Sequence, residues 1–286
     1  MSKKFAINFD EMLKKIKDQE KTFKKEVDET VFTPKYKEDG THVSIIRFLP
    51  SNDTDVPFVK KFNHGFQGNG GWFIEDCPTT IGEKCPVCES NNVLWKEGNE
   101  ATAKERKKRL NYWINILVVK DPQTPENEGR VFKYRFGKKI YDKIMEKINP
   151  TDGLTESVMV FDWYEGANFK LSIKQVKIAG QKAQPNYDSS TFAEKTSVGS
   201  DAKIEEIRKM ILPLQPIVDS KVFKTYDELS EKMEKVISGK KTFSVRPQVE
   251  TTASEESSGP SPESNSDGLE EQETDQDFFA KLKNRK

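Results

Sequence analysis

The pattern of hydrophobic and polar positions along the chain first indicates a series of short strands. Seven runs rich in β-branched and aromatic residues are separated by turn-forming residues, and they occupy positions 43–49, 58–62, 72–74, 112–119, 131–136, 158–161 and 169–178. Short strands that follow one another in this way are typical of a small barrel or sandwich. The pattern therefore predicts a β-rich centre.

Helical periodicity interrupts and flanks these runs. Apolar residues recur at i, i+3 and i+4 within residues 138–148, 201–212 and 226–237, as they do on the buried face of an amphipathic helix. Near the N-terminus a further helix is predicted behind a cap at Asn8 or Asp10, from the spacing of Phe9, Met12, Leu13, Ile16 and Phe23. The predicted fold class is α+β, with helices around a β-rich core.

The charge distribution marks off a C-terminal tail. Across 286 residues, 47 Lys and Arg balance 47 Asp and Glu. From residue 250 onward, however, ten acids face four bases, so the tail carries −6 and residues 1–249 carry +6. The tail has few aliphatic residues and is rich in Ser, Thr, Gln, Gly and Pro, so it cannot bury enough apolar surface to order itself. We expect residues 250–286 to form an acidic, disordered segment.

The first 26 residues form a second distinct part. Residues 1–25 hold eight lysines and four acids, a net charge of +4. Two interpretations stand side by side: a solvated basic face of a helix docked on the body, or a mobile arm that contacts a neighbouring molecule. Residues 27–249 are then the core of the protein.

Several classes of protein are excluded by what the sequence lacks. No stretch approaches the ~20 apolar residues of a membrane span, and no apolar region of a secretory signal precedes Asp10. Three cysteines are too few for a disulfide framework in a chain of this length, which indicates a reducing cytoplasm. The sequence also has no GxxxxGK(S/T) loop of a nucleotide hydrolase.

One histidine and all three cysteines of the chain lie close together in the sequence and suggest a metal site, with candidate ligands His64, Cys77, Cys85 and Cys88. Three thiolates and one imidazole at tetrahedral geometry favour zinc. Four protein ligands leave no open position for water, so the site is predicted to be structural, and the protein is not expected to be an enzyme. The alternatives are buried structural thiols beside an unrelated histidine, His42 as the nitrogen donor, or a catalytic metal with Glu75 or Asp76 as base.

A basic and aromatic region follows the cysteines. The segments KERKKRLNYW (104–113) and RVFKYRFGKK (130–139) interleave cations with aromatic residues. Lys and Arg side chains contact backbone phosphates, and aromatic rings stack on unpaired bases. This composition therefore suits a single-stranded nucleic acid better than a duplex. Phe132 and Phe136 are expected in the core. Exposure is more plausible for Tyr112 and Tyr134.

Two further residues of this region leave alternatives open. Trp113 must point away from Tyr112 on an extended strand, so at most one of the two faces a base while its neighbour packs inside. Arg47 stands alone in an apolar run and is either a groove cation or a snorkelling residue at a sheet edge.

Several longer runs carry a resemblance to a known family. In order along the chain they are SIIRFLPS (44–51), NHGF (63–66), GGWFIEDC (70–77), CPVC (85–88), YWINILVVKDP (112–122), PENEGRVFKYRFGKKIYDKI (125–144) and WYEGANFKL (163–171). This set resembles the single-stranded DNA-binding (helix-destabilising) proteins of T-even-type bacteriophages. Residues 43–190 are covered densely and both ends more weakly.

The resemblance implies an OB-fold core with a zinc subdomain at about residues 63–90, one structural Zn²⁺ and no catalysis. It implies cooperative, largely sequence-independent coating of single-stranded DNA during replication, recombination and repair in the cytoplasm of the infected bacterial host. A zinc-containing single-stranded RNA-binding translational regulator is the alternative. The DNA-binding residues that it implies, together with the basic run, are Arg47, Lys107, Lys108, Arg109, Tyr112, Tyr134, Arg135, Lys138, Lys139 and Tyr187.

The resemblance also implies partners at the two ends of the chain. A basic N-terminal arm, here with Lys3 and Lys4, contacts neighbouring copies of the protein along DNA. The acidic tail recruits replication and recombination proteins. No membrane partner is expected.

Overall fold

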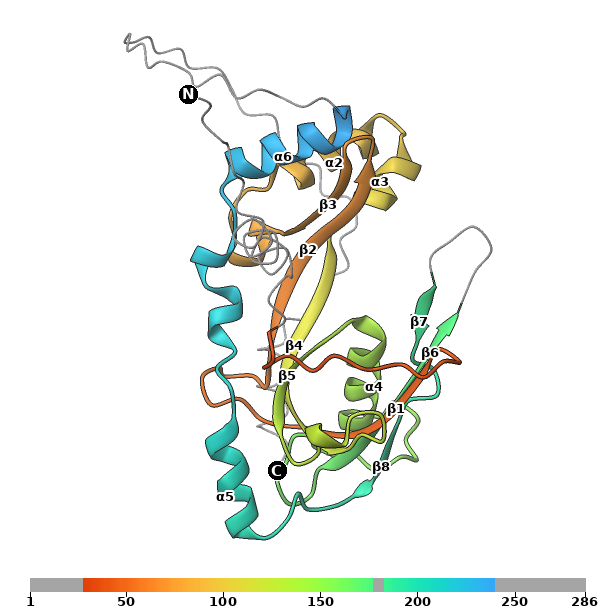
Figure 1. Ribbon diagram of the computed structural model, residues 1–286, viewed down its shortest axis with the longest axis vertical. Helices are drawn as coiled ribbons and strands as arrows, with labels where there is room; N and C mark the ends of the chain where they lie inside the picture. The colour runs from red at the N-terminus through yellow and green to blue at the C-terminus, as the bar shows by residue number, and fades with distance from the viewer. Residues whose placement is uncertain (1–27, 177–182, 240–286) are drawn as a thin grey trace, which may run out of the picture.

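The computed structural model describes residues 28–176 and 183–239 (Figure 1). The predicted basic arm with Lys3 and Lys4 and the predicted acidic tail at 250–286 lie outside these residues. The strands are β1 (Thr41–Phe48), β2 (Phe58–Gly68), β3 (Gly71–Asp76), β4 (Arg109–Lys120), β5 (Val131–Phe136), β6 (Ala167–Val176), β7 (Gln184–Asn186) and β8 (Thr191–Lys195). The α-helices are α2 (Pro86–Lys96), α3 (Glu100–Arg106), α4 (Lys138–Ile148), α5 (Asp201–Met210) and α6 (Tyr226–Ser238). In this part of the chain, no helix is long and apolar enough to cross a membrane.

Strand β4 is the centre of a curled antiparallel sheet. Its first half pairs with β2, its middle with β5 and its last residues with β1. The main path of the sheet runs β3-β2-β4-β1-β6-β7, with β5 joined to β4 and β8 joined to β6. Because β4 is bonded to different partners along its length, the sheet bends around it.

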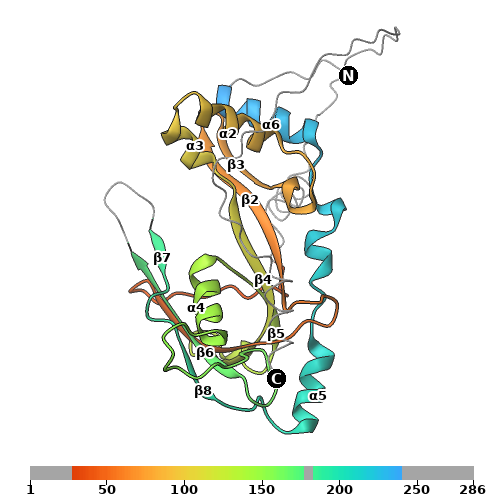
Figure 2. The same ribbon diagram turned by 180° about the vertical axis from the view of Figure 1, so that it is seen from behind.

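Helix α4 closes the inner side of the curled sheet. It places Ile140, Ile144 and Ile148 on one face, at the i, i+4 and i+8 spacing of a helix, and all three are buried. They pack with inward residues of the strands, such as Ile114 and Phe169, into the main core. Both ribbon views show α4 between the β4–β5 and β6–β7 parts of the sheet (Figures 1 and 2).

The outer side of the sheet is covered in part by α5. Ile207 of α5 packs with Leu49 and Leu117 in a small separate core. The segment that follows α5 contains two short helical turns, Gln215–Val218 and Ser220–Val222. It leads along the molecule to α6 (Figure 2).

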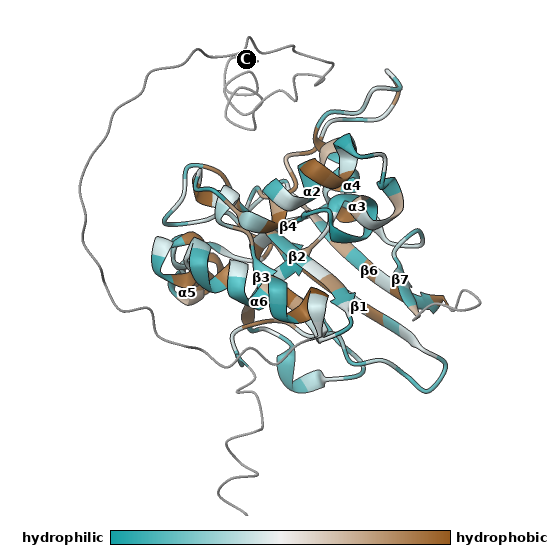
Figure 3. Ribbon diagram, turned by 90° about the horizontal axis from the view of Figure 1, so that it is seen from above, coloured by the Kyte–Doolittle hydropathy of each residue, from teal (hydrophilic) through white to brown (hydrophobic). Residues whose placement is uncertain are grey.

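A second lobe is built on the far ends of β2 and β3. Helices α2, α3 and α6 surround these strands, and their shared core contains Phe66, Phe73, Val87, Leu229 and Val236. Hydrophobic residues recur among hydrophilic ones along α6, as expected of a helix with one buried face (Figure 3). Glycine at the β2–β3 turn lets α6 approach closely, because a Cβ on Gly70 would lie 2.1 Å from the Lys235 carbonyl oxygen. The Gly70 amide donates to the Val236 carbonyl at 2.8 Å.

The structure confirms most of the predicted elements. Six of the predicted strands coincide with β1 to β6, and the three predicted core helices with α4, α5 and α6. The strand predicted at residues 158–161 is wrong. Val158 and Val160 are buried there, but the Val158 amide donates to the Lys147 carbonyl at the end of α4 instead of to a neighbouring strand. Apolar burial without strand pairing produced the same sequence pattern.

The close packing around Gly166 leads to a prediction about stability. A Cβ at this position would lie 2.4 Å from the Asp162 carbonyl oxygen and 2.5 Å from Nη2 of Arg47. We expect Gly166→Ala to lower the free energy of unfolding by about 1–3 kcal/mol, as overpacking does, in urea denaturation. Gly65→Ala is the control, since nothing lies within 4 Å of its added Cβ. Equal stability of the two variants would contradict this account.

Candidate metal centre and nucleic-acid interface

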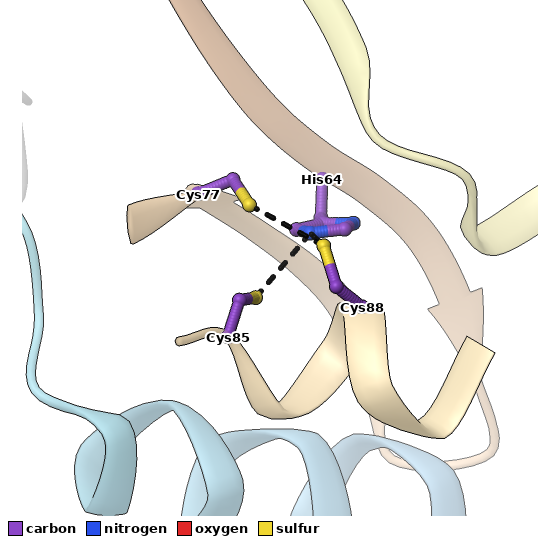
Figure 4. Close-up of side chains that lie close together, drawn as sticks. All are labelled: His64, Cys77, Cys85 and Cys88. Carbon is purple, nitrogen blue, oxygen red and sulfur yellow. Dashed lines mark hydrogen bonds between the residues drawn. The ribbon is translucent and has the colours of Figure 1, made fainter. Parts of the chain in front are cut away.

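The four predicted metal ligands converge inside the second lobe. His64 comes from β2, Cys77 directly follows β3, Cys85 immediately precedes α2 and Cys88 lies in its first turn. Their ligand atoms all lie within 4.8 Å of one another, and the side chains point toward a common centre (Figure 4). The structure therefore brings together the four residues selected from the sequence.

The ring of His64 is held so that one nitrogen faces the sulfurs. Its Nδ1 donates to the carbonyl of Arg106, at 3.0 Å, and its Nε2 lies 3.5 Å from the Sγ atoms of both Cys85 and Cys88. In metal-binding histidines, a hydrogen bond from the nitrogen that does not bind the metal fixes the tautomer and the orientation of the ring. The third sulfur, Sγ of Cys77, is hydrogen-bonded to the Thr79 hydroxyl at 3.2 Å.

The electrostatics of the cluster suit a cation. Hydrogen bonds from the Cys85 and Cys88 thiols hold the pKa of Cys77 well below its usual range. Burial acts to lower the pKa of His64, but hydrogen bonds with the cysteines and the Arg106 carbonyl outweigh it and raise the pKa to about 9. The hydrogen bonds of Cys88 with Cys77 and Cys85 raise the pKa of Cys88 well above its usual range. Three soft sulfurs and one imidazole fit a tetrahedral metal ion.

The competing assignments from the sequence have other partners. His42 is buried in β1, where its Nδ1 donates to the Lys35 carbonyl and its Nε2 contacts the Ser44 hydroxyl. Glu75 pairs with Lys224 and Lys232 of the α6 region, and Asp76 pairs with Lys61 at 2.6 Å. Neither His42 nor the two acids belongs to the cluster.

The cluster predicts metal-dependent order in this lobe. We expect purified protein to hold one metal ion per chain and Cys85→Ser to lose it, because three remaining ligands bind a metal far more weakly. Hydrogen exchange should then accelerate in β2, β3, α2 and α6, with β1 and β6 unchanged. Ser90→Ala, on the same helix but outside the cluster, should keep the metal. Full metal content in Cys85→Ser would contradict the assignment.

Tyr112 and Tyr134 lie inside the main core, which corrects the expectation that they are exposed. Only 5% of Tyr112 and 3% of Tyr134 is accessible, and burial raises the pKa of Tyr134 well above its usual value. The physical reason is that Tyr141 of α4 packs on Tyr112, with ring centroids 4.3 Å apart, and that Phe32, from the segment before β1, packs on Tyr134, with ring centroids 5.9 Å apart. A base cannot stack on either ring unless the covering residues move.

A column of aromatic rings leads from this core toward α4. The Tyr112 ring lies parallel to Phe136, with centroids 5.4 Å apart, and parallel to Tyr141 of α4, with centroids 4.3 Å apart. Tyr141 is half-buried, so it ends the column on the side of the helix. The sequence pattern did not single out Tyr141. An aromatic residue in the run KKIY (138–141), two positions after a pair of lysines, was the available signal.

Trp113 takes the opposite side of β4, as the alternation of strand residues predicted. Its cross-strand neighbour is Arg135 of β5, whose guanidinium lies 5.9 Å from the centroid of the indole ring. Trp113 is partly exposed and Arg135 is exposed. Of the two adjacent aromatics, Trp113 is therefore the accessible one.

Arg47 is neither the groove cation nor the edge residue that the sequence suggested. Its side chain is completely buried. Nη2 donates to the carbonyls of Asp162 at 2.7 Å and Thr196 at 2.9 Å, which is why an arginine is tolerated inside an apolar strand. In this structure it is out of reach of a DNA strand.

The remaining predicted cations are on the surface. Lys107 and Arg109 are exposed, and Lys108 lies over the Phe62 ring at 4.3 Å. Lys138 and Lys139 open α4 and are also exposed, with acidic neighbours: Lys138 pairs with Asp142 at 2.7 Å, and Lys139 with Asp188 at 3.5 Å.

Tyr187 lies near the start of α4, because its neighbour Asp188 pairs with Lys139 there. It is half-buried against the main core, and Lys143 of α4 donates to the Asp188 carbonyl at 3.2 Å. Lys139 and Tyr187 therefore lie close together although they are far apart in the sequence, whereas Tyr141 lies on the other flank of the start of α4, against Tyr112. We call the surface around the start of α4 the α4 surface, defined by Lys138, Lys139, Tyr141 and Tyr187.

A curled antiparallel sheet with a separate lobe that carries a Cys₃His cluster defines a class of β-rich protein with an accessory site that could hold a metal ion. The family model described as gp32 DNA binding protein like matches residues 38–237. The chain belongs to this family of gp32-like DNA-binding proteins.

Individual relatives agree with the family model. The single-stranded DNA-binding protein of Enterobacteria phage T2 is 42% identical over 208 residues, which cover 69% of this chain and 67% of the relative. The protein of the same name from Enterobacteria phage T4 is 41% identical over the same shares. A third, from Enterobacteria phage RB70, is 43% identical over 79 residues, which cover 26% of this chain and 67% of the relative.

Proposed function

We propose that this protein binds single-stranded DNA without strong sequence preference and coats it cooperatively during replication, recombination and repair. The observation that carries the proposal is the α4 surface, where cations and aromatic rings from separate segments meet in a chain of the gp32-like family. The phage origin of the relatives supports action in the cytoplasm of an infected bacterium. We propose no catalytic role.

The start of α4 is suited to a phosphate. Its first turn holds two lysines and no acid, and Gly137 at the N-cap offers no side chain to the free amides. Cations at this end oppose the helix dipole and cost stability. An anion placed there interacts favourably with the lysines, the amides and the dipole together. The unfavourable arrangement in the free protein thus supports binding of a DNA backbone.

Aromatic side chains beside these cations favour unpaired bases. Tyr141 and Tyr187 are partly accessible on the α4 surface, and a base that stacks on Tyr141 would extend the column of Tyr112 and Phe136. Stacking of this kind needs the π-face of a base, which a duplex hides. Trp113 beneath Arg135 offers a second, separate stacking position on the outer face of the sheet.

The fold supplies a rigid frame for this surface. We propose that the curled sheet is an OB-type barrel, a fold that binds single strands across its strands and loops. In the second lobe we propose one Zn²⁺ with a structural role, since all four ligand positions come from the protein. The lobe holds one end of β2 and β4, and its order therefore affects the sheet.

The first functional prediction concerns the lysines of α4. We expect Lys138→Gln with Lys139→Gln to weaken binding to oligo-dT and to reduce the slope of log affinity against log salt by about 0.7 for each lost phosphate contact. Lys147→Gln, at the other end of α4, should leave the slope unchanged. The measurement is fluorescence anisotropy at several salt concentrations, with duplex and matched RNA as competitors. An unchanged slope in the double variant, or equal affinity for duplex, would contradict the proposal.

A second functional prediction concerns stacking. We expect Tyr187→Ala to weaken oligo-dT binding by about 1–3 kcal/mol, the usual effect of removing one stacked ring, with little change in salt slope because no charge is lost. Tyr164→Ala is the control, because Tyr164 is 55% exposed and its hydroxyl donates to Asp201 of α5 instead. A loss of affinity as large in the control as in Tyr187→Ala would refute the role of Tyr187.

A further inference from the structure

Tyr36 is an exposed aromatic residue outside the α4 surface. It lies in the segment before β1, and 42% of it is accessible. Lysines precede and follow it in the sequence. One of them, Lys37, is exposed and makes no salt bridge within the part of the chain that the structure describes. An accessible ring next to a free cation is the combination that binds unpaired bases and their phosphates.

A series of ring contacts anchors Tyr36 on the main core. Phe32 packs on the buried Tyr134, with centroids 5.9 Å apart, and on His42, with centroids 6.1 Å apart. The Tyr36 ring in turn makes an edge-to-face contact with His42, with centroids 6.3 Å apart. A contact of this geometry covers at most one face of the Tyr36 ring. The core therefore holds the ring without enclosing it.

Hydrogen bonds on both sides of Tyr36 fix the backbone that carries it. Before it, the Lys35 carbonyl accepts from Nδ1 of the buried His42 at 2.8 Å. After it, the Lys37 amide donates to the Thr41 carbonyl at 2.8 Å. A ring on a fixed backbone loses little conformational freedom when a ligand binds, so more of the stacking energy appears as affinity.

The segment before β1 brings Tyr36 to the side of Tyr187. It starts beside β5, to which Phe32 is hydrogen-bonded, and crosses toward β6 and β7 (Figures 1 and 2). There β1 pairs with β6, and β6 pairs with β7, which ends directly before Tyr187. Burial raises the pKa of Tyr187, and the electrostatic effect of Tyr36 raises it further. Tyr36 therefore continues the flank of the α4 surface that Lys139 and Tyr187 form.

We propose that Tyr36 is a further base-stacking position, and that a bound single strand continues from Lys139 and Tyr187 onto this ring. The inference rests on the proposed function, because it extends the same surface for the same ligand. Lys37 supplies a positive charge for a backbone phosphate next to the stacked base. Stacking on a ring accepts any base, so this position suits a strand of any sequence.

Oligo-dT binding by full-length variants, measured by fluorescence anisotropy, tests this position. We expect Tyr36→Leu to weaken binding about fivefold to a hundredfold, because leucine keeps apolar bulk against His42 but has no ring on which a base stacks. Tyr36→Phe should bind as the wild type does, because it keeps the ring. Tyr226→Ala is the matched control, since Tyr226 is also 42% exposed but its hydroxyl donates to Glu89 in the second lobe.

Three results would overturn the position: wild-type affinity in Tyr36→Leu, an equal loss in Tyr36→Phe, or an equal loss in Tyr226→Ala. Ultraviolet cross-linking of the wild type to an oligonucleotide that contains bromodeoxyuridine needs no variant. We expect adducts at Tyr36, and adducts that never include it would also overturn the position. If the wild type binds oligo-dT and only the Tyr36 results are negative, the proposed function stands. If the wild type does not bind oligo-dT, both fall.

Discussion

The hydrogen bonding of β4 to three other strands is the constraint on which the rest of the structure depends. The start of the strand follows Arg106, whose carbonyl orients His64 toward the cysteines. Its middle sends Tyr112 into the core and Trp113 to the outer face, and its end pairs with the strand that carries Arg47. The hydrogen bonds of this one strand therefore connect the candidate metal lobe, the aromatic column and the strand that carries the buried arginine.

Electrostatics explain why this scaffold is suited to a polyanion despite a net charge of zero. Two lysines stand at the positive end of α4. This arrangement is unfavourable in the free protein, because the positive charges and the helix dipole oppose one another. It becomes favourable once an anion is present. The acids that pair with Lys138 and Lys139 hold these side chains at the surface by weak, exposed interactions that phosphate can replace.

The sequence allowed six of the strands, three helices and the cluster of His64 with three cysteines to be predicted, because periodicity and the spacing of Cys and His are local signals. It did not reveal which side chains the helices cover. Tyr112 and Tyr134 alternate correctly, but only the packing of α4 on Tyr112 and of Phe32 on Tyr134 shows that they are buried. Arg47 is satisfied by carbonyls 115 and 149 residues away, which no local pattern records. Tyr141 was missed for the same reason, since its stacking on Tyr112 is a tertiary contact.

Hydrogen–deuterium exchange of the full chain with and without oligo-dT tests the central claim most directly, because it maps the bound strand without altering any residue. The account predicts protection at the start of α4 and at residues 183–188, with a smaller effect on the outer face of β4 and β5. The lobe of α2, α3 and α6 should change little once its metal is bound. Protection confined to that lobe or to α5, with the start of α4 exchanging at its free rate, would contradict the account.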